Sequence, residues 1–219
     1  MTLRINHFDV KRTALVACLT MVGCGSTYAQ ECVADYFYQG KGPHAYYICP
    51  TENTSPTMQV EARIDTTSRG PRLKESFYPM EGVGDGFVAL ERTYQLQITD
   101  STIMATVWYE DAGLSTGGLR PTRGSLMYNL VLLKMPPMNE SASWTYEMER
   151  FGRVMQIWEM TVTHTTRDCV QNNQMYPAMP TLIVERRVYD ANHQPLPDHS
   201  TVSYWVKGFG KMGEFYLPN

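Results

Sequence analysis

The feature that most constrains the fold of this chain is an alternation of apolar and polar residues with a period of two. It is clear in Met58–Ile64 and again in Val88–Ile98. Successive side chains of a strand point to opposite faces, so this pattern predicts half-buried β-strands. Helical periodicity is nearly absent. The same alternation predicts further strands at Thr102–Tyr109, Ser125–Lys134, Trp144–Glu149, Arg153–Thr163, Thr181–Asp190 and Thr201–Val206.

Turn-forming residues separate these expected strands, at Asp100 and in segments 112–118, 135–143 and 191–198. Antiparallel neighbours need only short connections, whereas parallel neighbours need long crossovers. We therefore expect an all-β fold, either a strongly curved antiparallel sheet or an incomplete barrel, with few or no core helices. The longest loop-like stretches are Asp65–Arg72 and Ala112–Gly124.

Residues 1–29 have the pattern of a secretory signal peptide. Positive charges precede an uncharged, largely apolar run at Ala14–Val22, which is too short to span a bilayer. Two kinds of processing fit this pattern. One is cleavage after Ala29, which is favoured because residues 23–29, after the apolar run, have the length of a cleavage region. The other is lipid modification of Cys24. We expect a signal peptide at 1–29 and a single antiparallel β domain at 30–219. The protein would then be periplasmic or extracellular, or a membrane-anchored lipoprotein if Cys24 carries lipid.

Composition excludes two classes of protein. Of the 219 residues, 43% are hydrophobic, 11% aromatic and only 19% charged, whereas disordered chains are poor in aromatic residues and rich in charge. The formal net charge is −3, far from the basic balance that binding to phosphate backbones requires. We expect no nucleic-acid partner.

Three cysteines, Cys32, Cys49 and Cys169, follow the predicted signal. In an exported chain an odd number favours one disulfide and one remaining thiol. We predict a disulfide between Cys32 and Cys49, which flank a short aromatic segment. Pairing of Cys49 with Cys169 is the alternative. Metal binding by these thiols is not expected, because the sequence contains no CxxC pair.

Three segments in the second half of the chain carry motifs that can be compared with those of known proteins. They are Leu133–Pro137 with Ser143–Tyr146, Met175–Ala178 before Leu182–Tyr189, and Tyr204–Met212. In this order they resemble a group of uncharacterised exported bacterial β-proteins, the TapB-like group, and more distantly the periplasmic lipoprotein carriers. The resemblance covers residues 130–219. Met179 and Pro180 stand where the family's turn has glycine, so we expect that turn to be rebuilt.

The resemblance implies an exported, sheet-rich and non-enzymatic protein, and it brings no catalytic residues. It marks Trp144, Tyr204, Trp205, Gly208 and Gly210 as a structural motif. The two glycines would let the chain turn sharply after a strand that ends near Trp205.

Candidate catalytic and metal-binding residues are few. His164, Asp168 and Cys169 could in principle activate a thiolate, but enzymes of that kind assemble these groups from distant positions. His193 and His199 could ligate a metal with Asp198, yet a rigid solvated loop explains them as well. We therefore expect no catalytic residues, no cofactor and no bound metal.

Fourteen methionines and four tryptophans suit contact with an apolar molecule. The function we expect is a binding or carrier module for a lipid or another apolar ligand. The alternative is a structural or interaction protein of the envelope that docks an envelope protein partner. A carrier would have an open apolar cavity of roughly 300 to 1,000 Å³, and a structural module would have a filled interior.

Overall fold

The computed structural model describes residues 31–217 except 39–43, 53, 81–89, 111–122, 138, 151 and 172; for 108–110, 123–126, 150 and 198 it describes the backbone alone. The predicted signal peptide, including Cys24, lies outside the described residues. From Glu31 onward the chain forms one compact unit. Of the described residues, 73% lie in strands and none lies in an α-helix, which confirms the expected all-β fold.

One sheet holds all the strands in the order β6-β5-β4-β3-β2-β1-β11-β10-β9-β8-β7. It consists of two meanders, in each of which sequence neighbours pair side by side. The N-terminal meander comprises β1 (His44–Cys49), β2 (Met58–Thr67), β3 (Gly70–Pro79), β4 (Leu90–Ile98), β5 (Thr102–Glu110) and β6 (Arg123–Lys134). The C-terminal meander comprises β7 (Ser141–Arg150), β8 (Arg153–Gln171), β9 (Gln174–Asp190), β10 (Thr201–Val206) and β11 (Gly210–Tyr216).

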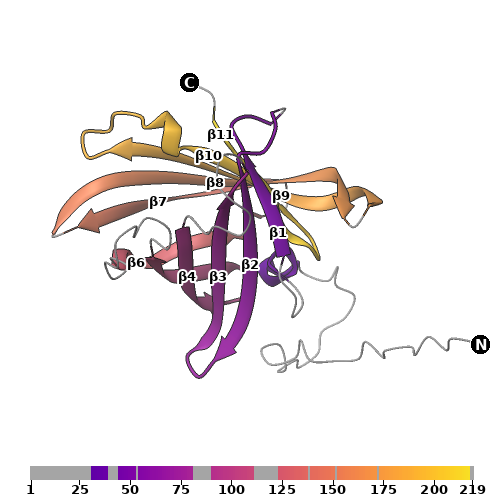
Figure 1. Ribbon diagram of the computed structural model, residues 1–219, viewed down its shortest axis with the longest axis horizontal. Helices are drawn as coiled ribbons and strands as arrows, with labels where there is room; N and C mark the ends of the chain where they lie inside the picture. The colour runs from indigo at the N-terminus through magenta and orange to yellow at the C-terminus, as the bar shows by residue number, and fades with distance from the viewer. Residues whose placement is uncertain are drawn as a thin grey trace, which may run out of the picture. The chain divides into compact units, whose positions relative to one another are not determined.

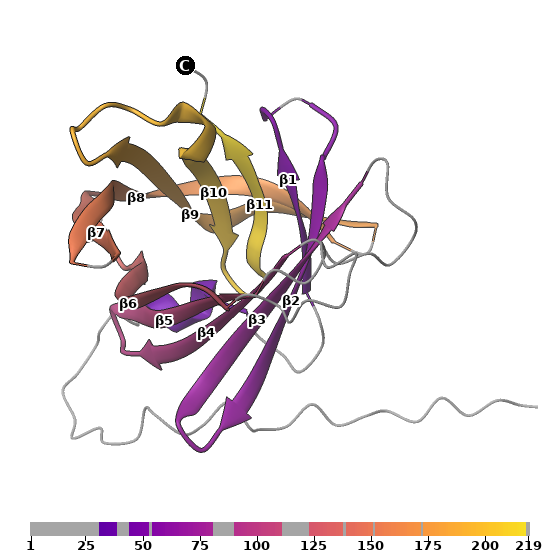
Figure 2. The same cartoon turned by 60° about the vertical axis from the view of Figure 1, so that its left-hand side comes forward.

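The two meanders are joined by the one parallel pair among the described strands, β1 with β11, in which Tyr47 lies opposite Gly213. The other neighbouring pairs of the described strands are antiparallel, as expected. Parallel pairing needs a long connection between its two strands, and here the rest of the domain supplies it. Figures 1 and 2 show β1 and β11 side by side at the junction.

The sheet curves into a nearly closed barrel whose seam, between β6 and β7, is not sealed by strand pairing. Figure 2 shows the two meanders as opposite walls. Apolar side chains from both walls meet inside, among them Leu73, Val107, Leu133, Val162 and Leu182, which are almost fully buried. The barrel thus has a core of its own rather than a continuous channel.

A short 3₁₀ turn, η1 (Val33–Tyr36), packs against the core at one end of the barrel. Its segment is fixed by backbone hydrogen bonds to two hairpin turns: Val33 N–H donates to Asp100 O at 2.9 Å, and Gly208 N–H donates to Asp35 O at 2.7 Å. Gly210 has φ +85°, and a Cβ there would lie 2.6 Å from Cδ1 of Tyr38. Glycine is therefore required at position 210 both by backbone conformation and by close approach.

Strands β1, β3 and β11 were not predicted from the alternation. Asp65–Arg72, expected as a loop, is the tip of the β2–β3 hairpin, where Thr67 pairs with Gly70. The pairing of β2 with β3 continues through these charged residues because the backbone N–H and C=O groups of both strands need hydrogen-bond partners there. Most of the other expected loop, 112–124, lies outside the described residues.

Strands β8 and β9 are longer than predicted and form an arm that extends to Gln171 and Gln174. Met175–Ala178, expected as a turn, is part of β9. A register shift opposite Asp168 accommodates Ala178, whose φ is +50°, and the Asp168 carboxylate accepts the Ala178 N–H at 2.9 Å. The arm bends at a bulge rather than at a turn.

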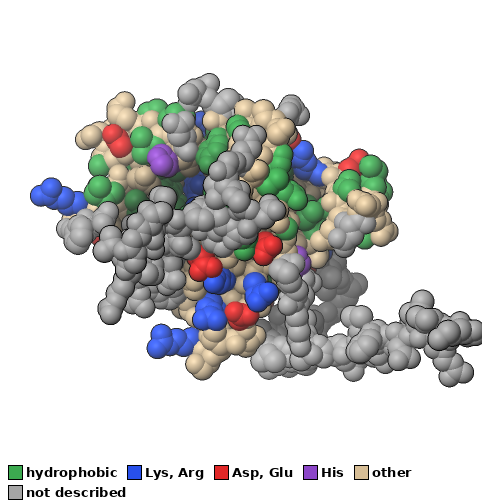
Figure 3. All heavy atoms as spheres, viewed as in Figure 1, with side chains coloured by type: hydrophobic (Ala, Val, Ile, Leu, Met, Phe, Trp, Pro, Cys, Tyr) green, Lys and Arg blue, Asp and Glu red, His purple; other side chains and the backbone are tan. Residues whose placement is uncertain are grey.

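The outer face of the N-terminal meander carries charges of both signs. Figure 3 shows Lys and Arg side chains next to Asp and Glu side chains over β2 and β3. Two ion pairs account for part of this face, Arg72 with Asp65 at 3.2 Å and Lys74 with Glu91 at 2.7 Å.

Candidate functional site

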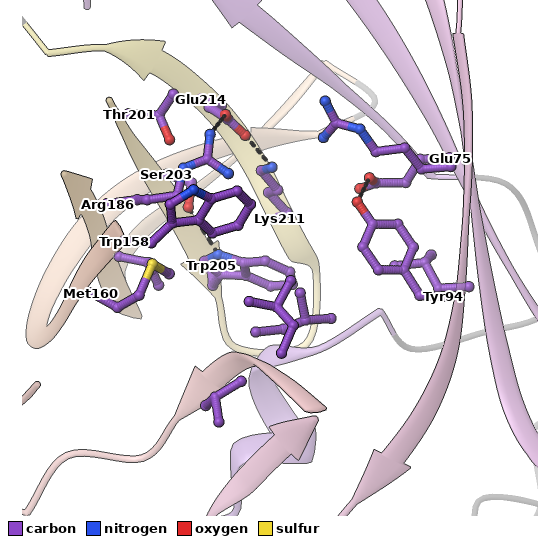
Figure 4. Close-up of a pocket in the computed structure, with 16 residues that line it drawn as sticks. Glu75, Tyr94, Trp158, Met160, Arg186, Thr201, Ser203, Trp205, Lys211 and Glu214 are labelled. Atoms are coloured by element: carbon purple, nitrogen blue, oxygen red, sulfur yellow. Dashed lines mark hydrogen bonds and ion pairs between the residues drawn. The ribbon is translucent and has the colours of Figure 1, made fainter. Parts of the chain in front are cut away.

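The candidate site is a cavity of about 80 Å³ between the two walls of the barrel. Figure 4 shows side chains of β8, β9, β10 and β11 on one side, facing Glu75 of β3 and Tyr94 of β4 on the other. The lining mixes aromatic rings with five charged residues: Glu75, Arg92, Arg186, Lys211 and Glu214. Charged side chains are seldom buried unless they are paired, so their partners determine what the cavity can do.

On the C-terminal wall, the carboxylate of Glu214 is held by two cations. Lys211 Nζ donates to Glu214 Oε2, and Arg186 Nη2 lies 3.7 Å from Glu214 Oε1. Burial acts to raise the pKa of Glu214, but the positive charges of Lys211, Arg186 and Arg92 outweigh it and bring that pKa to about 2. Glu214 is therefore ionised throughout the physiological range.

On the N-terminal wall, the carboxylate of Glu75 is held by neutral donors. Tyr46 OH donates to Oε1 at 2.9 Å and Tyr94 OH donates to Oε2 at 2.6 Å. Glu75 is 3% exposed. Burial, with the nearby carboxylates, raises the pKa of Tyr46 well above its usual value, so the tyrosine keeps its proton and remains a donor.

Tyr46 also joins the two walls. Its hydroxyl oxygen accepts from Lys211 Nζ at 3.2 Å while it donates to Glu75. A continuous chain of polar contacts therefore runs from Glu214 through Lys211 and Tyr46 to Glu75. Such a network resists rearrangement when every member is partnered.

Each cation of the cavity also covers an aromatic ring. The Arg92 guanidinium lies 4.4 Å from the Phe77 ring centroid, Lys211 Nζ lies 4.3 Å from that of Tyr46, and the Arg186 guanidinium lies 4.9 Å from that of Trp158. Cation–π contacts of this kind offset part of the cost of desolvating a charge.

One buried donor of the lining, Nε of Arg186, has no partner among the described residues. The hydroxyl of Tyr38, a residue that is 6% exposed and does not line the cavity, has none either. Tyr38 packs on Trp205, and burial together with the charges of Glu75 and Glu214 raises the pKa of its hydroxyl. Ser203 accepts from Trp205 Nε1 at 3.1 Å and still has a hydroxyl proton to donate.

The charges of the lining do not cancel. Three cations, Arg92, Arg186 and Lys211, face two carboxylates, Glu75 and Glu214. With donors left over and a positive excess, the cavity is suited to hold an electron-rich group.

A second hollow lies outside the barrel, next to the β9–β10 loop. It has a volume of about 470 Å³ and a mostly apolar lining that includes Val188, Pro195 and Leu217. Its volume falls within the range of small-molecule sites.

The three cysteines are unbridged in the structure. Cys32 directly precedes η1, while Cys49 is at the opposite end of β1 from His44, whose ring contacts Tyr38. The predicted Cys32–Cys49 bond is not formed in this structure.

The alternative pairing involves two segments that do make contact. Glu52, just after β1, accepts a hydrogen bond from Arg167 of β8 at 2.7 Å. Cys49 lies shortly before Glu52 in the sequence, and Cys169 lies shortly after Arg167. In that pairing Cys32 would take no part in a disulfide.

The five residues of the predicted structural motif have different surroundings. Trp205 is buried and stacks on Phe37 at 5.5 Å, while Tyr204 faces outward and donates to Glu52 at 3.1 Å. Gly208 and Gly210 form the β10–β11 turn, both with positive φ. Trp144 lies on β7, half-buried against the core.

His164, Asp168 and Cys169 do not converge. They follow one another along β8, where four residues span roughly 13 Å. Nε2 of His164 lies 3.4 Å from Pro136 O, and the carboxylate of Asp168 accepts a hydrogen bond from the Ala178 N–H. His193 and His199 both lie between β9 and β10, and no group of three metal-ligating side chains occurs within the described ranges.

Sequence reasoning missed the charged residues of the cavity, although their signal was present. Arg92 stands in register with Leu90, Tyr94 and Leu96, and Arg186 stands between Val184 and Val188. Glu75 likewise stands between Leu73 and Phe77. A charge that keeps the phase of the apolar face of a strand points into the core, where it needs a partner.

Comparisons with protein-family models, with curated proteins and with solved structures give no match for this chain. The resemblance to the TapB-like group therefore stays a prediction from its motifs. In the part of the chain that the structure describes, no helix has the length and apolar character needed to cross a membrane.

Proposed function

We propose that this protein is a non-enzymatic binding module, exported to the cell envelope, whose ligand site is the interior cavity of the barrel. The observation that carries the proposal is the charged lining of this cavity, which includes a buried donor, Arg186 Nε, without a partner among the described residues. Leaving a buried donor unpaired costs about 1–3 kcal/mol. Such a cost is offset when a bound molecule supplies the acceptor.

Export is supported by the signal-like pattern of residues 1–29. A binding role is supported by the arrangement of the charges, because the carboxylates are already held by tyrosines or by cations. Groups engaged in this way hold and orient a ligand more readily than they transfer protons to it.

A carrier of an apolar ligand is the second candidate, and the outer hollow favours it. That hollow has about 470 Å³ and an apolar lining, whereas the interior cavity has about 80 Å³ and a charged one. An acyl chain would fit the outer hollow better, since that lining is mostly apolar whereas charged side chains line the interior cavity.

Native mass spectrometry of the protein purified from its own envelope distinguishes these candidates. Thr201→Leu adds bulk to the lining of the interior cavity, and Leu217→Asp puts a carboxylate into the outer hollow. The interior site predicts that a co-purified mass is lost in Thr201→Leu and kept in Leu217→Asp. The opposite pattern would support the apolar carrier. A wild-type protein that carries no ligand and is stabilised by none in a thermal screen would support a structural module.

A further inference from the structure

We propose that β7 binds an extended segment of a partner protein, which adds to the unpaired edge of β7 as a further strand. In this segment apolar residues alternate with Lys or Arg. The inference concerns the seam of the barrel rather than the interior cavity, so it is independent of the proposed function.

The first argument is the backbone of β7. Among the described strands, β7 pairs with β8 alone, and β6, on the other side of the seam, pairs with β5 alone. Every second residue of an edge strand directs its N–H and C=O groups away from the sheet. Another extended chain offers donors and acceptors in the matching order, so an unpaired edge is a template for strand addition.

The second argument is that the edge of β7 is regular. The stretch Ser141–Met148 contains no Lys or Pro, and its pairing with β8 shifts register only after Met148. The edge of β6 differs, because its pairing with β5 shifts register at three places and Asn129 has φ +53°. Bulges, Lys and Pro are devices by which proteins prevent pairing at an edge. Of the two edges at the seam, β7 is therefore the one suited to accept a strand.

The third argument is the apolar lining of the seam. Trp144 and Tyr146 of β7 lie opposite Met160 and Trp158 of β8, and all four pack on the core. The two β8 residues are each 7% exposed, whereas those of β7 are only half-buried. Leu132 of β6 is half-buried as well. An added strand covers such side chains with its own apolar residues, at every second position because successive side chains point to opposite faces.

The position of the seam limits what can bind there. A strand added to β7 lies on the side of β6, and Figure 2 shows β6 below β7. A strand that already belongs to a folded sheet carries a further strand about 4.8 Å away on its other side, which β6 would obstruct. A second copy of the domain therefore fits this edge poorly, whereas a single extended segment fits it.

The outward face of β7 determines the charge of the segment. Glu147 and Glu149 are exposed there, and neither forms an ion pair with another described side chain. The stretch Ser141–Glu149 contains no Lys or Arg. Opposite charges on facing residues stabilise a strand pair, and like charges oppose it. Lys or Arg at the outward positions of the segment therefore complements β7.

Binding of designed peptides tests the inference. The probe is a fluorescein-labelled octapeptide of alternating Lys and Val, and binding is read from fluorescence anisotropy at constant ionic strength. A block peptide of the same composition lacks the alternation, and an alternating Glu–Val peptide has the opposite charge. We expect saturable binding of the Lys–Val peptide and roughly 10-fold weaker binding of the other two. Equal binding of all three, or binding of none, would overturn the inference.

Methylation of the peptide's backbone nitrogens separates strand addition from charge attraction alone. Two versions of the Lys–Val peptide carry N-methyl groups on every second residue, in opposite phases, so each lacks donors along one edge. Pairing with β7 requires the donors of one edge, so we expect one version to lose binding and the other to keep it. Full affinity in both versions would overturn strand addition.

Glu147→Lys tests the location of the site. It reverses a charge on the outward face of β7 and leaves the apolar face unchanged. We expect roughly 10-fold weaker binding of the Lys–Val peptide and tighter binding of the Glu–Val peptide. Glu61→Lys makes the same change at an exposed residue of β2, away from the seam, and should alter neither affinity. Equal effects of the two variants would place the peptide elsewhere and overturn the inference.

Amide hydrogen exchange distinguishes the partner segment from a second copy of the chain. We expect exchange in Ser141–Met148 to slow when the Lys–Val peptide is added, and exchange in β3 to stay the same. The protein without peptide should sediment as a monomer in analytical ultracentrifugation. A dimer whose β7 amides are already protected without peptide would assign the edge to a second copy and overturn the inference.

Discussion

The two walls of the barrel each bury one carboxylate, and they hold it in different ways. On the C-terminal wall, Glu214 is paired with Lys211 and Arg186, so its charge is balanced by charge. On the N-terminal wall, Glu75 receives the hydroxyls of Tyr46 and Tyr94. The comparison shows that burial alone does not determine how a carboxylate is stabilised. The partners that the neighbouring strands supply determine it.

The difference has an energetic consequence. A buried charge that loses its counter-charge is exposed to the full desolvation penalty, whereas a carboxylate that loses one of two neutral donors keeps the other. Disruption of the C-terminal wall should therefore cost more than disruption of the N-terminal wall.

Lys211→Met should have the largest effect. It removes the closest cation from Glu214 and also the donor to Tyr46, while methionine fills a similar volume. We expect a loss of about 3–5 kcal/mol in the free energy of unfolding, as for other broken buried ion pairs. Urea denaturation measures it. Arg187→Ala, which breaks an exposed ion pair with Glu185, serves as control and should cost less than about 1 kcal/mol. Equal costs would show that the network of the C-terminal wall does not stabilise the fold.

Acid should weaken the C-terminal wall next. The pKa of Glu214 in the folded protein is about 2, below its ordinary value of 4.5. A lowered folded pKa adds stability that is present above pH 4.5 and disappears as pH falls through 2. The contribution is about 3 kcal/mol. Denaturation curves of the wild type and of Glu214→Gln between pH 6 and pH 2 measure it. A parallel loss of stability in both proteins would assign the acid sensitivity to other groups.

Tyr94→Phe tests the N-terminal wall. It removes one of the two hydroxyl donors to Glu75 and leaves Tyr46 in place. We expect a loss of about 1.5–3 kcal/mol, the usual range for a hydrogen bond to a charged group. A cost as large as that of Lys211→Met would erase the distinction between the walls. Thermal denaturation at neutral pH, with both variants compared in one buffer, decides this.

The smallest effect is expected on the outer face of the same wall. Arg72→Ala breaks the exposed pair with Asp65 in the β2–β3 hairpin. Its cost should be at most about 1 kcal/mol and should shrink further in high salt. If it matched Tyr94→Phe in chemical denaturation, the surface charges rather than the buried network would stabilise this meander.

The fold was more accessible from the sequence than the site was. Alternation predicted β4, β5 and β10 nearly to their ends and β2 as far as Ile64, because these stretches have a sequence pattern with a period of two. It missed β11, whose sequence contains Gly210 and Gly213, and β3, in which Arg72, Lys74 and Glu75 obscure the pattern. Those strands depend on backbone pairing with their neighbours, which a single segment does not reveal.

The cavity combines residues from strands that are distant in sequence, and this limited its prediction. The register of Arg92 with the apolar residues of β4 indicates an inward-facing charge, but it does not name a partner. The contact between Lys211 and Tyr46 depends on the parallel pairing of β1 with β11, which no local pattern encodes.

That parallel pairing also governs the order in which the domain can assemble. Each meander is built from hairpins between sequence neighbours, which form quickly because little chain has to be ordered first. The junction of Tyr47 with Gly213 must await the last strand of the chain, and the cavity exists only after that junction forms. We therefore expect the meanders to form before the cavity does, and a chain that ends before β11 lacks the strand that carries Lys211 and Glu214 to the cavity.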